Sequence, residues 1–139
     1  MNRVIQKISP WNDPNQTSRQ SFAIHSLLER ESRKSDGIKS SFHAACLVYK
    51  KRIVGVGINK RKSHPMMTRH SPRRGQIYLH AEVDAIIKVI NNFGVEILSE
   101  CSLYVLRTTK TGIIASSKPC EGCQGHINHF GIKEVFWTP

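Results

Sequence analysis

The sequence predicts a single α/β domain, in which helices cover a sheet and the elements stack in layers. Two segments, 80–92 and 120–130, have helical apolar spacing, and each is followed by a short β-rich run. Ahead of them, the β-rich runs 44–49 and 53–58 flank a short basic turn, as the two strands of a hairpin do. Because strands and helices alternate after this hairpin, we expect a largely parallel sheet beyond it.

Length and composition set the broad class of the protein. The chain has 139 residues, of which 39% are hydrophobic, and this is enough for one domain with a core. Its apolar runs are too short to span a membrane, and the first seven residues have no apolar signal-peptide core. We therefore expect a cytoplasmic protein, and metal-bound thiolates would fit the same reducing compartment.

The N-terminal part of the chain divides into an arm and the start of the domain. Residues 1–16 are polar and contain two prolines, which predicts a loose N-terminal arm, while residues 17–139 form the domain. The domain opens with a predicted helix over 17–34. Its apolar stripe includes Ile24 and Leu28, which we expect to pack in the core.

A strongly basic stretch, residues 60–74, follows the second strand of the hairpin, which Asn59 closes. It has six Lys or Arg residues and no acidic residue, and it leads into the next predicted helix. Its position favours a loop that overhangs the site and contacts phosphate, with Arg73 and Arg74 as the best candidates and His64 as a weaker one. The alternative is a solvated, charged loop.

The remaining elements follow in regular order. Gly94 ends the helix at 80–92. After it we expect a strand at 103–108, a turn at 110–112 with a short returning strand at 113–115, a helix at 120–130 capped by Gly131, and a last strand at 134–138.

Zinc-binding residue types open the two predicted helices. His80 begins the first, and Cys120 and Cys123, which follow Pro119, face the same way in the first turn of the second. Three protein ligands leave one zinc position open for water, whose pKa falls there to about 7. Glu82, two residues after His80, is placed to carry a proton beside the metal. The pattern therefore predicts a catalytic Zn²⁺ site with Glu82 as the acid/base.

A lone C-x-x-C pair also has simpler explanations. It can be a redox pair or half of a structural zinc site, and a structural site would need a fourth protein ligand. Cys46 and Cys101 are the remaining cysteines, and both lie in apolar strand-like runs that are typical of core thiols. The order H-x-E and then P-C-x-x-C, with each half opening a helix, favours the catalytic site.

The charge of the chain points to its partners. The formal net charge is +11 and the isoelectric point is about 9.9. Such an excess favours an anionic partner, either the phosphate of a nucleotide or a nucleic acid. The alternative is that the charge only keeps the protein soluble.

Residues 44–138 resemble the cytidine and deoxycytidylate deaminase superfamily, because zinc nucleobase deaminases carry H-x-E and P-C-x-x-C in this order. The resemblance implies a three-layer α/β/α sandwich with a mixed central sheet and a bound Zn²⁺ cofactor. It also implies that Asn59 contacts the sugar of the substrate and that the backbone of Ala81 contacts the base. Family members are commonly oligomers, so the resemblance leaves both a monomer and a homo-oligomer open for this chain.

Two features place the chain within that superfamily. A histidine first ligand, His80, is similar to deoxycytidylate, tRNA-adenosine and polynucleotide cytosine deaminases, whereas small free-cytidine deaminases use cysteine there. Residues 109–118 depart from the usual pattern, in which the third strand leads directly into P-C-x-x-C, and we expect them to form a hairpin. The compact form is similar to deaminase-like proteins of phages and other large viruses.

These observations leave three functional hypotheses. The first is hydrolysis of the amidine C–N bond of cytosine in a nucleotide such as dCMP, which gives the uracil product and ammonia. The second is a polynucleotide deaminase that acts on a flipped cytosine or adenine in single-stranded DNA or RNA. The third is a zinc-bearing nucleic-acid binder without catalysis, and Glu82 argues against it because binding alone needs no acid/base beside the metal.

Overall fold

A computed structural model describes residues 18–37, 41–69 and 78–138. The predicted N-terminal arm, residues 1–16, lies outside these residues. The elements in chain order are α1 (Ser18–Ser32), β1 (Phe42–Tyr49), β2 (Arg52–Ile58), β3 (Lys60–Ser63), α2 (Met66–Arg69), β4 (Tyr78–Leu79), α3 (Ala81–Phe93), the 3₁₀ helix η1 (Glu96–Glu100), β5 (Ser102–Thr108), β6 (Ile114–Ala115), α4 (Glu121–Phe130) and β7 (Glu134–Trp137).

The central sheet has five strands in the order β2-β1-β5-β6, with β7 also beside β5. β1 is antiparallel to both β2 and β5, β6 is antiparallel to β5, and only β7 runs parallel to β5. The expected mixed sheet is confirmed, but the expectation of a largely parallel one is wrong. The crossovers through α3 and α4 do make β2, β5 and β7 parallel to one another. β1 lies between β2 and β5, however, so most neighbouring pairs are antiparallel.

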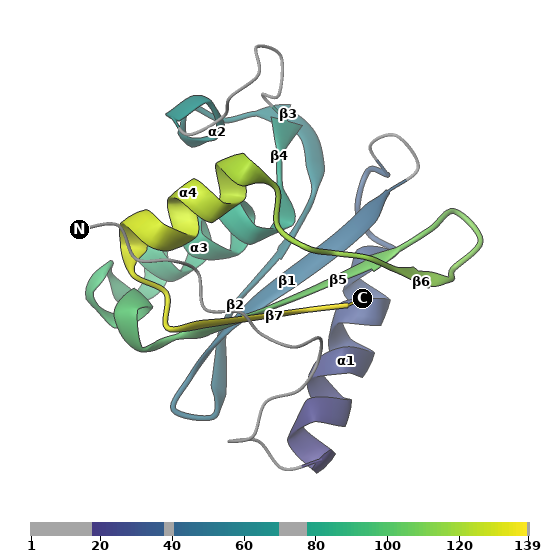
Figure 1. Cartoon of the computed structure of the whole chain (residues 1–139), viewed down its shortest axis with the longest axis horizontal. Helices are drawn as coiled ribbons and strands as arrows, with labels where there is room; N and C mark the ends of the chain where they lie inside the picture. Colours follow the sequence, from purple (N-terminus) through teal and green to yellow (C-terminus); the bar gives the residue numbers. More distant parts are fainter. Residues whose placement is uncertain (1–17, 38–40, 70–77, 139) are drawn as a thin grey trace.

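The elements form three layers, as the resemblance implied. α3 and α4 lie side by side over one face of the sheet, and α1 lies against the other (Figure 1). Successive residues of β1 alternate between the two cores: Ala45 and Leu47 pack with α3, whereas Ala44 and Cys46 pack with α1. Burial on both faces explains why residues 44–48 of the strand are all apolar instead of alternating with polar residues.

Helix α1 is fixed to the sheet by its apolar stripe and by one buried polar contact. Ile24 and Leu28 are fully buried, as predicted, and pack in the same core as the stacked rings of Tyr104 and Phe136. At the end of the helix, the hydroxyls of Ser32 and Thr108 lie 3.1 Å apart in a buried hydrogen bond. No helix of the described part is long and apolar enough to cross a membrane.

The basic stretch after β2 is more regular than predicted. β3 pairs with β4, the two residues just before His80, and Met66–Arg69 form the short helix α2. The sequence predicted a plain loop over residues 60–74. This prediction is wrong for residues 60–63 and 66–69, which form β3 and α2, and residues 70–74 lie outside the described residues. Polar and charged residues can form a strand here because β4 supplies a backbone partner.

The predicted hairpin within residues 109–118 is confirmed. Thr109 N donates a hydrogen bond to Ile113 O at 2.9 Å, and Gly112 takes the positive φ of 86° that this turn requires. The returning strand β6 pairs with Arg107 and Thr108, whereas β7 pairs with β5 from Ser102 to Val105. The hairpin thus continues the edge of β5 beyond the end of β7.

The start of α3 is held directly against the end of β2. A Cβ atom at Gly57 would lie 2.3 Å from Ala81 O and 2.4 Å from Ala85 N, so only glycine allows this approach. The buried carboxylate of Asp84 accepts a hydrogen bond from Ile58 N at 3.1 Å. It also pairs with the ammonium groups of Lys60 and Lys88, each at 3.3 Å. These contacts fix the first turn of α3, which carries His80 at its N-cap.

We expect Gly57→Ala to lower the free energy of unfolding by about 1–3 kcal/mol, because the added methyl group forces α3 away from β2. Gly55→Ala is the matched control, since it lies on the same strand and meets first the side-chain atom Cγ2 of Val89 at 2.7 Å. Its loss should be smaller. Urea unfolding of both variants measures the difference, and an equal or reversed order would contradict the close approach at Gly57.

Candidate metal centre

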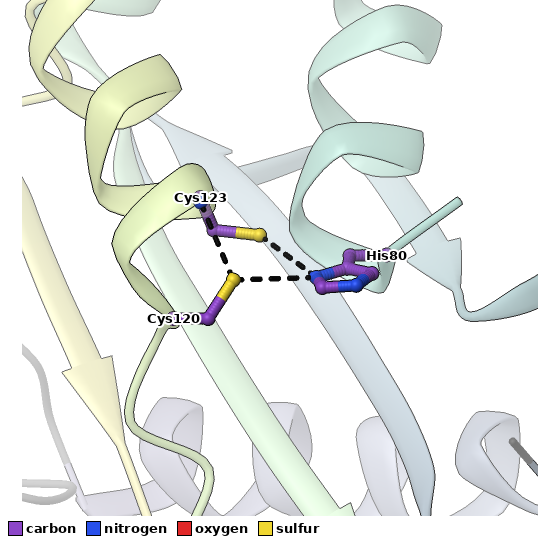
Figure 2. Close-up of side chains that lie close together, drawn as sticks. All are labelled: His80, Cys120 and Cys123. Atoms are coloured by element: carbon purple, nitrogen blue, oxygen red, sulfur yellow. Dashed lines mark hydrogen bonds between the residues drawn. The ribbon is translucent and has the colours of Figure 1, made fainter. Parts of the chain in front are cut away.

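His80, Cys120 and Cys123 come together at the starts of α3 and α4 (Figure 2). The Nδ1 atom of His80 lies 3.2 Å from Cys123 Sγ and 3.5 Å from Cys120 Sγ. All three candidate ligand atoms lie within 4.8 Å of one another. In a tetrahedral site, Zn–N and Zn–S bonds of about 2.0 and 2.3 Å place the N and S atoms roughly 3.5 Å apart. The observed separations therefore fit zinc.

Two helix N-termini converge on these ligands. His80 is the N-cap residue of α3, and its carbonyl accepts from Asp84 N at 2.9 Å. Cys120 is the N-cap residue of α4, and its Sγ accepts from Cys123 N at 3.5 Å. The positive ends of both helix dipoles thus lie at the cluster, where they favour thiolates over thiols.

The two thiols share one proton in a way that suits a divalent cation. The hydrogen bond from the Cys123 thiol lowers the pKa of Cys120 to about 3, with a further contribution from His80. The same hydrogen bond, together with burial, raises the pKa of Cys123. The pair thus carries one thiolate and one proton, and a bound zinc ion would take the place of that proton.

The described residues offer three metal ligands at this cluster and no fourth. Cys46 and Cys101 are buried thiols of the two cores, as predicted, and the S–H of Cys101 donates to Ile97 O at 3.2 Å. Burial raises the pKa of the Cys101 thiol to about 11, which keeps it protonated. A set of three ligands is typical of catalytic zinc rather than of a closed structural site.

An apolar cluster shields one side of the sulfur ligands. Met67, from the short helix α2, packs with Leu79, Val83 and Cys123, and all four are buried. The basic stretch after β2 therefore contributes a buried wall to the site in addition to its charges. Such a wall limits water around the thiolates and strengthens their interaction with a cation.

Glu82 is buried in the first turn of α3, with 4% of its surface exposed. Burial raises the pKa of its carboxyl above the ordinary value, and the charge of Cys120 acts in the same direction, although His80 opposes them. The Glu82 carboxyl and the Cys123 thiol affect each other's pKa, which places Glu82 beside the metal ligands. A carboxyl that is close to the cluster and easily protonated is suited to carry protons there.

The other residues singled out in the sequence lie around this cluster or outside the described part. Asn59 is buried: its Oδ1 accepts from His43 N at 2.8 Å and its Nδ2 donates to Ser41 O at 2.9 Å. Ala81 begins α3 and is fully buried. His64 Nδ1 accepts from Met66 N at 3.1 Å at the start of α2.

Arg73 and Arg74 lie outside the described residues. The contacts with substrate that were expected of them, and of Asn59, Ala81 and His64, stay predictions.

Two residues near the cluster were missed from the sequence. His43 on β1 and Arg107 on β5 are paired across the two strands. Burial lowers the pKa of His43 to about 4, and the charges of Arg107 and His80 add to this effect. The imidazole is therefore neutral near pH 7 and can both donate and accept a hydrogen bond. The sequence held one indication of His43. It lies two residues before Ala45 and four before Leu47, and residues spaced by two on a strand face the same side of the sheet.

A profile of the family described as "Cytidine and deoxycytidylate deaminase zinc-binding region" matches residues 18–138. No curated protein sequence matches the chain. Among solved structures, a dCMP deaminase from the cyanophage S-TIM5 in apo form is similar, with 19% identity and a TM-score of 0.57 over 86% of this chain and 82% of that one.

Two other solved structures show the same likeness. A guanine deaminase from Bacillus subtilis has 22% identity and a TM-score of 0.53, over 87% of this chain and 63% of that one. A mutant cytidine deaminase from Mycobacterium tuberculosis has 14% identity and a TM-score of 0.51, over 80% of this chain and 81% of that one. At these identities the likeness shows a shared fold.

Cys120→Ser is expected to lose most of the bound zinc and to lower the stability of the fold, because the starts of two helices are tied to that ion. Cys101→Ser is the control, since it removes a thiol that lies outside the cluster and should keep about one zinc per chain. Elemental analysis of the purified proteins measures both. Full zinc occupancy in Cys120→Ser would contradict the ligand assignment.

The imidazole of His43 is expected to stay neutral from pH 8 down to about pH 5.5, whereas an ordinary histidine titrates near 6.5. Because the folded chain then binds fewer protons than the unfolded one, His43 should lower stability as the pH falls from about 6.5 to about 4, with no further change below that. NMR spectra of ¹³C-labelled histidine follow the titration, and His43→Gln identifies the signal. A transition of that signal near pH 6.5 would contradict its burial.

Proposed function

The chain belongs to the cytidine and deoxycytidylate deaminase family, and on this premise we propose that it removes the amino group of cytosine in a nucleotide such as dCMP. As a member of that family it is a zinc-dependent hydrolytic deaminase. Water is the co-substrate, and the products are the uracil nucleotide and ammonia. The experiments below test which base and which phosphate state the enzyme accepts.

The observation that carries the proposal is the buried Glu82 carboxyl beside the three ligands. A zinc ion held by three protein ligands supplies a water nucleophile near neutral pH. Glu82 takes the proton that this water releases and delivers a proton to the leaving amino group. Its raised pKa lets it hold the proton between the two transfers.

The substrate is held by groups around the cluster. We assign the contact with the sugar to Asn59, which lies at the end of β2 and joins it to the start of β1. The backbone of Ala81, at the start of α3, contacts the base. Arg73 and Arg74 bind the phosphate, with His64 as a weaker contact, because an arginine fork can bind two phosphate oxygens at once.

A nucleotide substrate is supported by the net charge of +11 and by the fold shared with a structure that is described as a dCMP deaminase. The fold is also shared with a structure described as a guanine deaminase, so the base must be tested directly. Ammonia release from a panel of nucleosides, nucleotides and oligonucleotides is the experiment. We expect dCMP to give the highest kcat/KM, and a higher value for a guanine or adenine compound would contradict the proposal.

A polynucleotide is the second candidate substrate, and the two-stranded sheet of β3 and β4 favours it. Tyr78, two residues before His80, is 43% exposed and offers a ring on which a base can stack. Arg61 and Lys62 on the paired strand are also exposed and can contact phosphates. Polynucleotide binding should weaken steeply with salt, in proportion to the phosphates neutralised, whereas binding of a mononucleotide should change far less.

Glu82→Gln is expected to keep zinc and substrate binding but to lose at least about 10²–10⁴-fold in kcat, because the amide cannot shuttle protons. Glu121→Gln is the matched control: it removes an exposed carboxylate from the first turn of the other ligand-bearing helix and should leave kcat within a few-fold. Steady-state kinetics and zinc content are measured for both. Near-normal turnover of Glu82→Gln would assign the proton transfer elsewhere.

A further inference from the structure

Arg107 lies on the face of the sheet that carries the metal ligands. Leu103 and Val105 of β5 pack in the core beneath α3 and α4, and Arg107 follows them at the same two-residue spacing. Its neighbour on β1 is His43, which lies two residues before Ala45 and therefore faces the same side. Asn59 N in turn donates to His43 O at 3.4 Å. A polar row, Asn59–His43–Arg107, therefore crosses this face beyond the apolar core.

The positive charge of Arg107 is poorly compensated. Within the described part of the chain, no carboxylate lies within 4.0 Å of its guanidinium. Its Nη1 donates to Ser116 O at 3.2 Å, while its Nε is buried and has no hydrogen-bond partner among the described residues. Partly burying a cation against a single neutral acceptor is unfavourable, so an anion at this position would stabilise it.

The position of Arg107 relative to the metal centre follows from its neighbour. His43 is the direct neighbour of Arg107 across β1 and β5, and the charges of His80 and Cys120 also act on it, so this end of the polar row lies near the ligands. Arg107 is one strand farther along the sheet, and neighbouring strands are about 4.8 Å apart. Its bond to Ser116 O, four residues before Cys120, places it beside the segment that leads to that ligand.

We propose that Arg107 binds the phosphate of the substrate nucleotide. In this arrangement Asn59, at one end of the polar row, contacts the sugar, and Arg107, at the other end, holds the phosphate. The proposal rests on the proposed function and assigns the anion to a strand residue in addition to the basic stretch after β2. His43 lies between the two ends of the nucleotide, as a neutral hydrogen-bonding group. Arginine suits this role because two N–H groups of its guanidinium can bind two phosphate oxygens together.

The simpler alternative is that Arg107 only holds the segment that leads from β6 to Cys120. Its bond to Ser116 O is such a contact, and its loss would disturb the metal ligands. A purely structural role predicts equal damage to every substrate and a loss of zinc. An anion site predicts damage that depends on whether the substrate carries a phosphate, so the two roles can be separated.

The experiment compares dCMP with deoxycytidine for the zinc-loaded wild-type protein, Arg107→Ala, Arg107→Lys and Lys110→Ala. Lys110 is the matched control because it is an exposed cation in the turn of the same hairpin. We expect Arg107→Ala to lose about 10–100-fold in kcat/KM for dCMP, chiefly through KM, and within a few-fold for deoxycytidine. Arg107→Lys keeps the charge but not the fork and should lie between.

Zinc content and the unfolding midpoint are measured for each variant. Equal losses on dCMP and deoxycytidine in both Arg107 variants, or no loss in either, would overturn the anion site. Arg107→Lys provides this comparison even if Arg107→Ala does not fold.

A binding measurement separates this proposal from the proposed function. Titration of the zinc-loaded proteins with inorganic phosphate, followed by calorimetry, should show binding that Arg107→Ala weakens and Lys110→Ala preserves. If no cytosine compound is deaminated but this pattern holds, the proposed substrate is wrong and the anion site stands. If dCMP is deaminated while phosphate binding and the preference for dCMP over deoxycytidine are both independent of Arg107, the anion site is overturned and the function stands.

Discussion

The meeting of two helix N-termini on one face of the sheet is the constraint on which the site depends. His80 and Cys120 both serve as N-cap residues, so the same backbone geometry that starts each helix also presents a ligand. The first turn of α3 cannot shift, because Gly57 allows it to touch β2 and the carboxylate of Asp84 binds the backbone of Ile58. Glu82, the proposed acid/base, lies in that same turn, so the packing of α3 against β2 also fixes its place beside the candidate ligands.

The hairpin after β5 links the sheet to the segment that carries Cys120. By continuing the edge of β5 past β7, it extends the sheet under the segment that leads to Cys120. Ser116 O then accepts from Arg107, which ties the ligand-bearing segment to a cation on the sheet. The hairpin and the polar row are thus parts of one arrangement, which places the cation of Arg107 beside the segment that leads to Cys120.

Local features were predictable from the sequence, whereas features set by pairing were not. The spacing of His80, Glu82 and the two cysteines indicates the chemistry because helix starts impose it locally, and turn residues indicate the hairpins. The antiparallel majority of the sheet was missed because it depends on β1 lying between β2 and β5. His43 and Arg107 were missed for the same reason, since only the register of β1 with β5 makes them neighbours.

Side chains of α3 also bind the backbone at the outer edge of the sheet. β2 is an edge strand of the central sheet, and in the described part no strand pairs with its outer side. There the ammonium of Lys88 donates to Val56 O at 3.0 Å, while Asp84 accepts from Ile58 N. Backbone groups that would otherwise recruit a strand from another molecule are thus occupied by side chains of the same chain. This occupation disfavours edge-to-edge pairing of two copies over Val56 to Ile58.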